Sequence, residues 1–412
     1  MRKYVLITLA VMTVLVGCQK SDDDDIIKGT NPAKRVSYTI TSESDIANLY
    51  EYCLEIPIFD NLPAAIKTLV PTVLNSYFNQ TSPAHIYRYE YESTGPDGKP
   101  VTLSSALIVP LDAITGDNPV DQLVLGNHFS SMRYDECPTM SGCIEGLLAW
   151  KNAAVVMPDY YGFGASQDKV QAYLNPDIAG CGSLDAFLAA ETLMKDKRID
   201  VPEKTMNLGY SQGGFNAIAN LRYLSLHPEY DIHFDQTFAG GGPYNVINTF
   251  NSYLEGGFDS VFPLILVTLT SLNEIENLGI DYADIFKEPL LSNYQDWVLS
   301  KKYDSSEVTG LLGSTRPAKH LTENMTSCSG PIFEKYLAVA DKYSLNKGWT
   351  PDRNEKITLF HSKGDDMVPY SNFESMVQFL DGKCQLQSIT QPSGSHELTY
   401  VAFLLHVIQY GM

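Results

Sequence analysis

The 412-residue chain combines a large apolar content with a strong negative charge. Hydrophobic residues make up 44% of it and charged residues 19%, which excludes intrinsic disorder over most of the length. With 29 Lys and Arg against 49 Asp and Glu, the formal net charge is −20, which argues against binding to nucleic acid or to an anionic membrane by surface charge. The length allows two or three average domains, or one large α/β domain with insertions.

The first residues predict a secretion signal and a lipid anchor. Two basic residues precede an apolar stretch at 4–16, which at about thirteen residues is too short to span a bilayer. The stretch ends in Gly17-Cys18, and small residues before a cysteine resemble the bacterial lipobox, in which Cys18 is lipidated. We therefore expect a signal peptide at 1–17 and an extracytoplasmic protein, held to the outer membrane or cell surface by this lipid anchor only. An ordinary secretory signal is the alternative.

An acidic run follows the anchor. The four aspartates at 22–25 resemble the surface-export tag of lipoproteins from Bacteroides-like bacteria. They lack the alternate spacing and the glycine of a calcium loop. We interpret 18–41 as a solvated tether, and the remainder, 42–412, as one folded domain.

Six cysteines remain besides the lipidated one. An extracytoplasmic location permits disulfides, which we expect here with the connectivity left open among fifteen possibilities. No cysteine and histidine spacing indicates a metal site. The six are Cys53, Cys137, Cys143, Cys181, Cys328 and Cys384.

The folded part begins with a helical pattern and then changes period. From 42 to 78 apolar residues recur at helical spacing, so an N-terminal helical segment is expected at 42–84. Alternating residues at 86–91 and an apolar run at 101–109 flank the turn Gly95-Pro96-Asp97-Gly98. This pattern predicts a β-hairpin.

Short apolar strands then alternate with amphipathic helices. We expect strands at 122–126, 153–158, 205–210 and 234–239, and helices at 144–151, 184–195 and 214–226. No strand pattern occurs at 244–354, after which strands at 356–361 and 386–390 alternate with helices at 371–380 and 398–409. The fold class is therefore α/β, a mostly parallel, doubly wound sheet with an inserted helical cap at 244–354.

One pentapeptide within this pattern indicates a nucleophile. Gly209-Tyr210-Ser211-Gln212-Gly213 fits G-x-S-x-G, and it lies between a predicted strand and a predicted helix, as a nucleophile elbow requires. Small residues suit this position because the turn is strained and two backbones pass closely. The elbow would expose Ser211 above the carboxyl edge of the sheet, where α/β folds bind ligands.

A serine nucleophile needs a base and an orienting carboxylate. The segment 361–369 follows a strand and contains Asp365, four residues before the proline of a Val-Pro pair, with Asp366 as the alternative acid. His396 lies in a loop between the last strand and the terminal helix. The chain order Ser211, Asp365, His396 is that of a hydrolase triad.

From about residue 86 to the end, the chain resembles an α/β-hydrolase, closest to secreted lipases and esterases with a Gly-Tyr-Ser-Gln-Gly-Gly elbow. The segment 157–166 also resembles the family's Asp-Tyr-x-Gly-x-Gly-x-Ser motif, which shapes the substrate pocket. By this resemblance Tyr160 and Tyr161, together with Tyr210, belong to the pocket. Asp159 is interpreted as a structural acid.

Acyl transfer also needs two donors for the developing oxyanion. One would be the backbone N–H of Gln212. The other should come from the loop after 122–126, where Phe129 is favoured and His128 is next, although the family's usual His-Gly pair is missing there. The chemistry requires no metal and no organic cofactor.

These features predict a serine hydrolase that cleaves carboxylic esters, small-molecule or lipid, through an acyl-enzyme. A serine peptidase of the prolyl-oligopeptidase type without its propeller is the alternative, and a polysaccharide deacetylase or feruloyl esterase is a variant. A binding protein with a vestigial triad is the non-enzymatic interpretation. The sequence leaves the acyl chain, the alcohol and the oligomeric state open.

Overall fold

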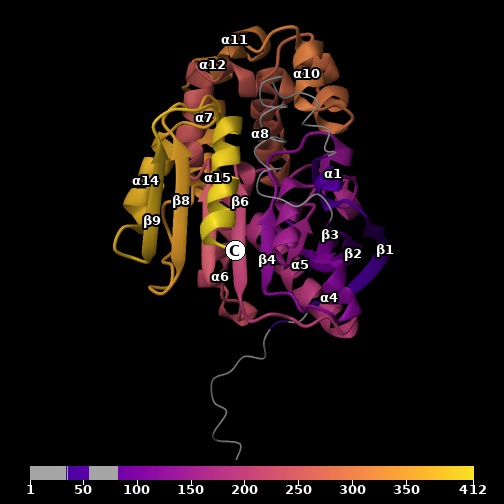
Figure 1. The fold of residues 1–412 in the computed structure, drawn as a ribbon. Helices are drawn as coiled ribbons and strands as arrows, with labels where there is room; N and C mark the ends of the chain where they lie inside the picture. Colours follow the sequence, from indigo (N-terminus) through magenta and orange to yellow (C-terminus); the bar gives the residue numbers. More distant parts are fainter. Residues whose placement is uncertain (1–33, 35, 55–81) are drawn as a thin grey trace, which may run out of the picture. The chain divides into compact units, whose positions relative to one another are not determined.

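The computed structural model describes residues 34, 36–54 and 82–412. Within these residues the chain builds one nine-stranded sheet of order β1-β2-β3-β5-β4-β6-β7-β8-β9 (Figure 1). The strands are β1 (Tyr38–Ile46), β2 (Ala84–Thr94), β3 (Pro100–Pro110), β4 (Gln122–Asn127), β5 (Ala153–Pro158), β6 (Thr205–Tyr210), β7 (Gln236–Gly240), β8 (Lys356–Ser362) and β9 (Gln385–Gln391). The pairs among β1, β2, β3 and β5 are antiparallel, and all others are parallel.

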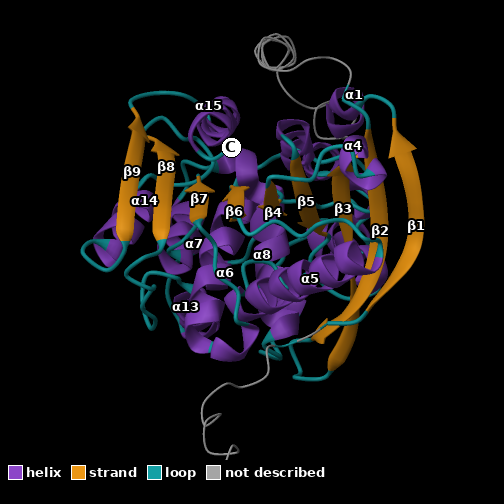
Figure 2. Ribbon diagram, turned by 60° about the horizontal axis from the view of Figure 1, so that its bottom comes forward, coloured by secondary structure: helices purple, strands orange, loops and turns teal. Residues whose placement is uncertain are grey.

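The parallel strands are buried on both faces, which explains their nearly continuous apolar sequences. In β4, Leu123 and Leu125 point into one core and Val124 into the other. The first core lies under α5 (Pro176–Asp196), α6 (Gln212–Leu226) and α14 (Ser371–Leu380), and the second under the 3₁₀ helix η3 (Ile144–Lys151) and α15 (His396–Tyr410) (Figure 2).

The stretch between β7 and β8 is helical, as the missing strand pattern predicts. Its described residues form α7 (Val246–Glu255), α8 (Phe262–Ile275), α9 (Leu290–Tyr294), α10 (Ser305–Leu312), α11 (Pro317–His320), α12 (Glu323–Thr326) and α13 (Pro331–Tyr343), with short 3₁₀ and π turns between them. It contacts the loops that leave the carboxyl ends of β4 and β5: Ser271 Oγ accepts from the Tyr173 N–H at 2.9 Å, and Arg133 pairs with Asp304 at 3.4 Å.

Two N-terminal features differ from the sequence prediction. Residues 42–46 belong to strand β1, which pairs antiparallel with β2, and the helix α1 covers only Leu49–Leu54. β1 is mostly exposed and carries Glu43 and Asp45, so it shows no clear apolar alternation, and its partner strand decides its conformation. The rest of the expected helical segment, 55–81, lies outside the described residues.

The other elements form where the sequence predicts them, with shifted ends. Helix α5 begins at Pro176, eight residues early, because the Asn175 side chain caps it by accepting from the N–H groups of Asp177 and Ile178. The segment 144–151 is helical but of the 3₁₀ type, and six consecutive residues of it, 144–149, are buried. That burial leaves no polar face of the kind that an exposed amphipathic helix shows.

The expectation of disulfides is wrong for the described residues, whose six cysteines are all free thiols. Four of them, Cys53, Cys137, Cys143 and Cys181, are buried and pack as small apolar side chains. The predicted signal peptide, Cys18 and the tether up to residue 33 lie outside the described residues. In the part of the chain that the structure describes, no helix is both long and apolar enough to span a membrane.

Candidate active site

Ser211 occupies a strained turn between β6 and α6. Its φ is +59° and its ψ −124°, a conformation that a non-glycine residue rarely adopts and that clusters at functional sites. The turn is held because the Ser211 N–H donates to Gly240 O of β7 at 2.9 Å. A Cβ on Gly213 would lie 2.0 Å from Asn127 O, so only glycine fits where β4 and the elbow meet. The sharp strand–turn–helix geometry that the sequence predicts around Ser211 is therefore present.

The predicted acid and base of the triad meet in the structure. Asp365 follows β8, and its Oδ2 accepts from His396 Nδ1 at 2.7 Å. Its other oxygen, Oδ1, accepts from the N–H groups of Met367 and Val368 at 2.9 and 2.8 Å, which fixes the carboxylate. Asp366, the alternative acid, instead accepts from the backbone N–H of His396 at 3.0 Å. The contact to the imidazole thus belongs to Asp365.

His396 is the first residue of α15 and not a loop residue. Ser395 caps this helix by accepting from the Leu398 N–H. Tyr210, next to Ser211 in the chain, donates to His396 O at 2.9 Å, and the two rings are 4.9 Å apart. The Nε2 of His396 is buried and has no hydrogen-bond partner among the described residues, Ser211 included, so this nitrogen is not committed to another group.

The acid and the base shift each other's pKa. Burial alone would raise the pKa of Asp365, but the rings of His396 and His361 outweigh it and hold that pKa well below its usual range. Burial alone would lower the pKa of His396, but the Asp365 carboxylate outweighs it and raises that pKa above the ordinary 6.5. The pair is therefore built to stabilise an imidazolium beside an ionised carboxylate.

The residues expected at the oxyanion hole lie around the elbow. Gln212 begins α6, where the first backbone N–H groups have no partner within the helix. The loop of Asn127 to Phe129 crosses the elbow, since a Cβ on Gly213 would also lie 2.9 Å from His128 O. The His128 ring is buried and stacks on Tyr160, and burial lowers its pKa to about 4, so this imidazole is neutral. The choice between Phe129 and His128 as the second donor stays a prediction.

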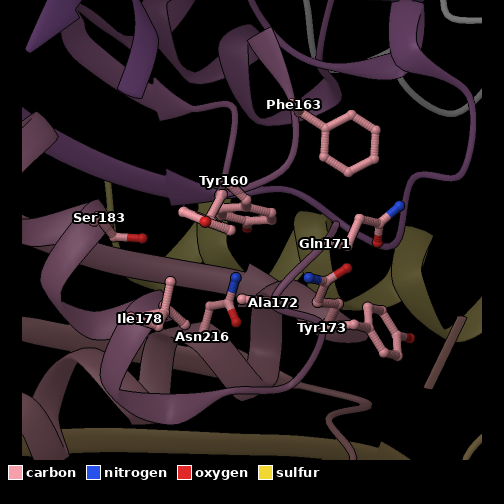
Figure 3. A pocket seen from close by; sticks show the side chains of 12 residues that line it. Tyr160, Phe163, Gln171, Ala172, Tyr173, Ile178, Ser183 and Asn216 are labelled. Carbon is pink, nitrogen blue, oxygen red and sulfur yellow. The ribbon is translucent and has the colours of Figure 1, made fainter. Parts of the chain in front are cut away.

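A cavity opens beside Gln212, with about 390 Å³ of empty space including its mouth (Figure 3). Of the three residues expected at the substrate pocket, Tyr160 and Tyr161 line this cavity and Tyr210 does not, because its ring is buried against His396. Two polar side-chain atoms in the lining, Ser183 Oγ and Asn216 Oδ1, are buried without a partner among the described residues. The lining also includes Phe163, Gln171, Ala172, Tyr173, Ile178, Ala179, Gly182 and Gln212.

Asp159 is confirmed as a structural acid. Its carboxylate accepts from Ser104 Oγ at 2.5 Å, and from the N–H and Oγ1 of Thr139 at 2.8 and 2.6 Å. The side chain is fully buried, and this burial raises its pKa to about 6. These bonds tie the loop after β5 to β3 and to the loop after β4, which are the walls of the site.

Sequence reasoning missed a buried carboxyl group behind the site. Glu145 on η3 accepts from Tyr400 Oη at 2.8 Å, while its Oε2 is buried without a partner among the described residues. Burial raises its pKa to about 7. The Tyr400 ring in turn packs against Tyr210 and the edge of Phe129. Glu145 thus holds Tyr400 of α15, which packs against Phe129 in the loop after β4, and its helical context gave no signal of this role.

Neither the family models nor the curated proteins give a match to the sequence. Comparison with solved structures does give matches. The rice cell wall degrading esterase LipA from Xanthomonas oryzae superposes with a TM-score of 0.73 at 18% identity, over 90% of this chain and 97% of that one. The fold is that of the α/β-hydrolases.

Two further structures share this fold. A hydrolase candidate from Legionella pneumophila matches with a TM-score of 0.71 at 17% identity, over 92% of this chain and 97% of that one. Lipase A from Candida antarctica matches with a TM-score of 0.57 at 13% identity, over 87% and 77%. At these identities the likeness concerns the architecture. Among the described residues, no group of three or more His, Cys, Asp and Glu side chains is arranged to hold a metal ion.

Proposed function

We propose that this protein is a serine hydrolase that cleaves carboxylic esters through an acyl-enzyme. One observation carries the proposal: Ser211 stands on a strained elbow in the α/β-hydrolase fold, and Asp365 and His396, which are bonded to each other at 2.7 Å, follow neighbouring strands at the same edge of the sheet. Backbone strain at this half-buried serine costs stability, so a reactive role accounts for it better than packing does. The esterase and lipase names of similar structures agree with this chemistry.

The residues divide the reaction between them. His396 Nε2 takes the proton of Ser211 Oγ as the serine attacks the ester carbonyl, and Asp365 holds the imidazole by its Nδ1–H and stabilises the imidazolium. Backbone N–H groups at Gln212 and in the loop after β4 bind the oxyanion. His396 then gives the proton to the leaving alcohol, and a water repeats the sequence to release the acid.

An ester panel tests the proposal. Purified wild type, Ser211→Ala and the control Ser225→Ala, an exposed serine on the same helix, are assayed on p-nitrophenyl acetate, butyrate and decanoate and on aminoacyl-p-nitroanilides. The proposal expects ester turnover by wild type and Ser225→Ala, and a loss of about 10⁴-fold or more in Ser211→Ala. Turnover of anilides alone would instead support the peptidase. No turnover of any ester by folded wild type would refute the proposal.

We also propose that Cys18 carries the lipid anchor. Support comes from its place after the apolar stretch at 4–16. In cells, Cys18→Ser should move the protein from the membrane fraction to the soluble fraction. Retention of Cys18→Ser in the membrane fraction would contradict this anchor.

A further inference from the structure

A second histidine contacts the carboxylate that orients His396. His361, near the end of β8, is fully buried, and its Nε2 lies 3.3 Å from Asp365 Oδ2, the oxygen that also accepts from His396. We propose that His361 is a positioning residue of the active site, which fixes Asp365 and the turn that carries it through one N–H group. This inference rests on the proposed function of Ser211, Asp365 and His396.

The surroundings of the ring define its tautomer. Nε2 has two acceptors at hand, Val368 O at 3.2 Å and Asp365 Oδ2, so it carries a proton. Nδ1 is buried and has no partner among the described residues, so a proton there would leave an unpaired donor. The hydrogen bond of His361 is thus donated from Nε2, while Nδ1 finds no acceptor among the described residues. His361 differs in this from His396, whose Nδ1 donates to the acid.

The N–H group of His361 closes the turn after β8. Val368 donates its backbone N–H to Asp365 Oδ1, and its carbonyl accepts from His361. The histidine therefore links the strand to the far side of the turn, across the carboxylate. The ring centroids of Tyr370 and Phe373 lie 5.7 and 6.1 Å from that of His361, both in edge-to-face arrangements that keep the imidazole in place. If His361 only packed against these two rings, an apolar ring would serve as well. The two acceptors near Nε2, in contrast, require an N–H donor.

Two substitutions separate the donor from the shape of the side chain. His361→Phe keeps a ring and removes the N–H, and His361→Gln keeps an N–H donor and removes the ring. His320 in the cap provides the matched control, because it too is buried, with Nε2 bonded to the carbonyl of Ser314 at 2.8 Å and Nδ1 unpartnered among the described residues. His320→Phe therefore removes an equivalent hydrogen bond away from the triad.

Two measurements compare these variants with wild type. The first is kcat and KM on p-nitrophenyl acetate. The second is the low-field proton resonance of the His396 Nδ1–H, which reports its hydrogen bond to Asp365 and does not depend on turnover. If wild type proves inactive on esters, the resonance still decides the role of His361, so failure of the proposed function and failure of this inference are distinguishable.

We expect His361→Phe to lower kcat by about 10- to 100-fold with KM nearly unchanged, and to shift or broaden the resonance. His361→Gln should restore most of both, and His320→Phe should leave both as in wild type. A folded His361→Phe with wild-type kcat and resonance would overturn the proposal, as would a His361→Gln variant no better than His361→Phe. Should His361→Phe unfold, His361→Leu makes the same comparison with a smaller side chain.

Discussion

Replacing Asp365 by asparagine changes one atom of the side chain and should remove most of the activity. The Asp365 Oδ2 accepts from His396 Nδ1 at 2.7 Å, and its Oδ1 accepts from two backbone N–H groups. An asparagine oxygen will stay with those two donors, which turns the amide NH₂ toward His396 Nδ1. The imidazole then has to accept at Nδ1 and carry its proton on Nε2, so it cannot act as base toward Ser211.

The size of this loss follows from the tautomer. In a Ser-His-Asp triad the wrong tautomer lowers kcat by about 10⁴-fold, equivalent to about 5.5 kcal/mol of transition-state stabilisation. In wild type the pKa of His396 lies above the ordinary 6.5, so kcat/KM should fall on the acid side as His396 takes up a proton. Without the carboxylate that raises this pKa, the acid limb of Asp365→Asn should move to lower pH.

The assay is the pH dependence of kcat/KM on p-nitrophenyl acetate for wild type, Asp365→Asn and Asp366→Asn. Asp366 accepts from the backbone N–H of His396, while the imidazole donates to Asp365, so the asparagine variant of Asp366 serves as the matched control and should lose far less activity. A larger loss in Asp366→Asn than in Asp365→Asn would assign the acid to Asp366 and refute the reasoning. So would an unchanged acid limb in Asp365→Asn.

Three further predictions concern the scaffold and the pocket. Gly213→Ala should destabilise the fold by several kcal/mol because its Cβ would meet Asn127 O, whereas Gly310→Ala, in open helical space, should stabilise it by about 0.5–1 kcal/mol in urea unfolding. Burial raises the pKa of Glu145 from 4.5 to about 7, so the stability linked to its protonated form is present below pH 4.5 and lost as pH rises through 7. Glu145→Gln has no carboxyl proton to lose, so its free energy of unfolding should gain about 3 kcal/mol relative to wild type between pH 4 and pH 9. An equal difference at both pH values would contradict this. The small, partly polar cavity predicts acetate and butyrate esters to exceed decanoate in kcat/KM by about tenfold or more, and a preference for decanoate would show that the acyl group binds elsewhere.

The parallel half of the fold and the contact between Asp365 and His396 were open to prediction because their signals are local. The alternation of short apolar strands and helices gives a doubly wound sheet, and the elbow around Ser211 needs glycine at fixed offsets. Asp365 and His396 follow strands whose carboxyl ends share one edge of the sheet, so topology alone brings them together. The structure confirms that meeting at 2.7 Å.

Other features depend on partners distant in the chain, which a single sequence does not show. Strand β1 forms because β2 offers it an edge, although its own residues alternate poorly. Glu145 meets Tyr400 across 255 residues, and nothing in its neighbours marks it as buried. Tyr210 lies within the elbow motif, yet its ring packs against His396 and Phe403 in the second core and does not line the cavity.

The most direct test of the central claim is covalent labelling of native protein with a fluorophosphonate, followed by peptide mass spectrometry. The probe reacts with a serine only where a base and an oxyanion hole activate it. The structure predicts a single adduct on Ser211 that is lost in His396→Ala and after unfolding in urea. A native, folded protein that takes no label, or that takes it on another serine, would contradict the assignment of this site.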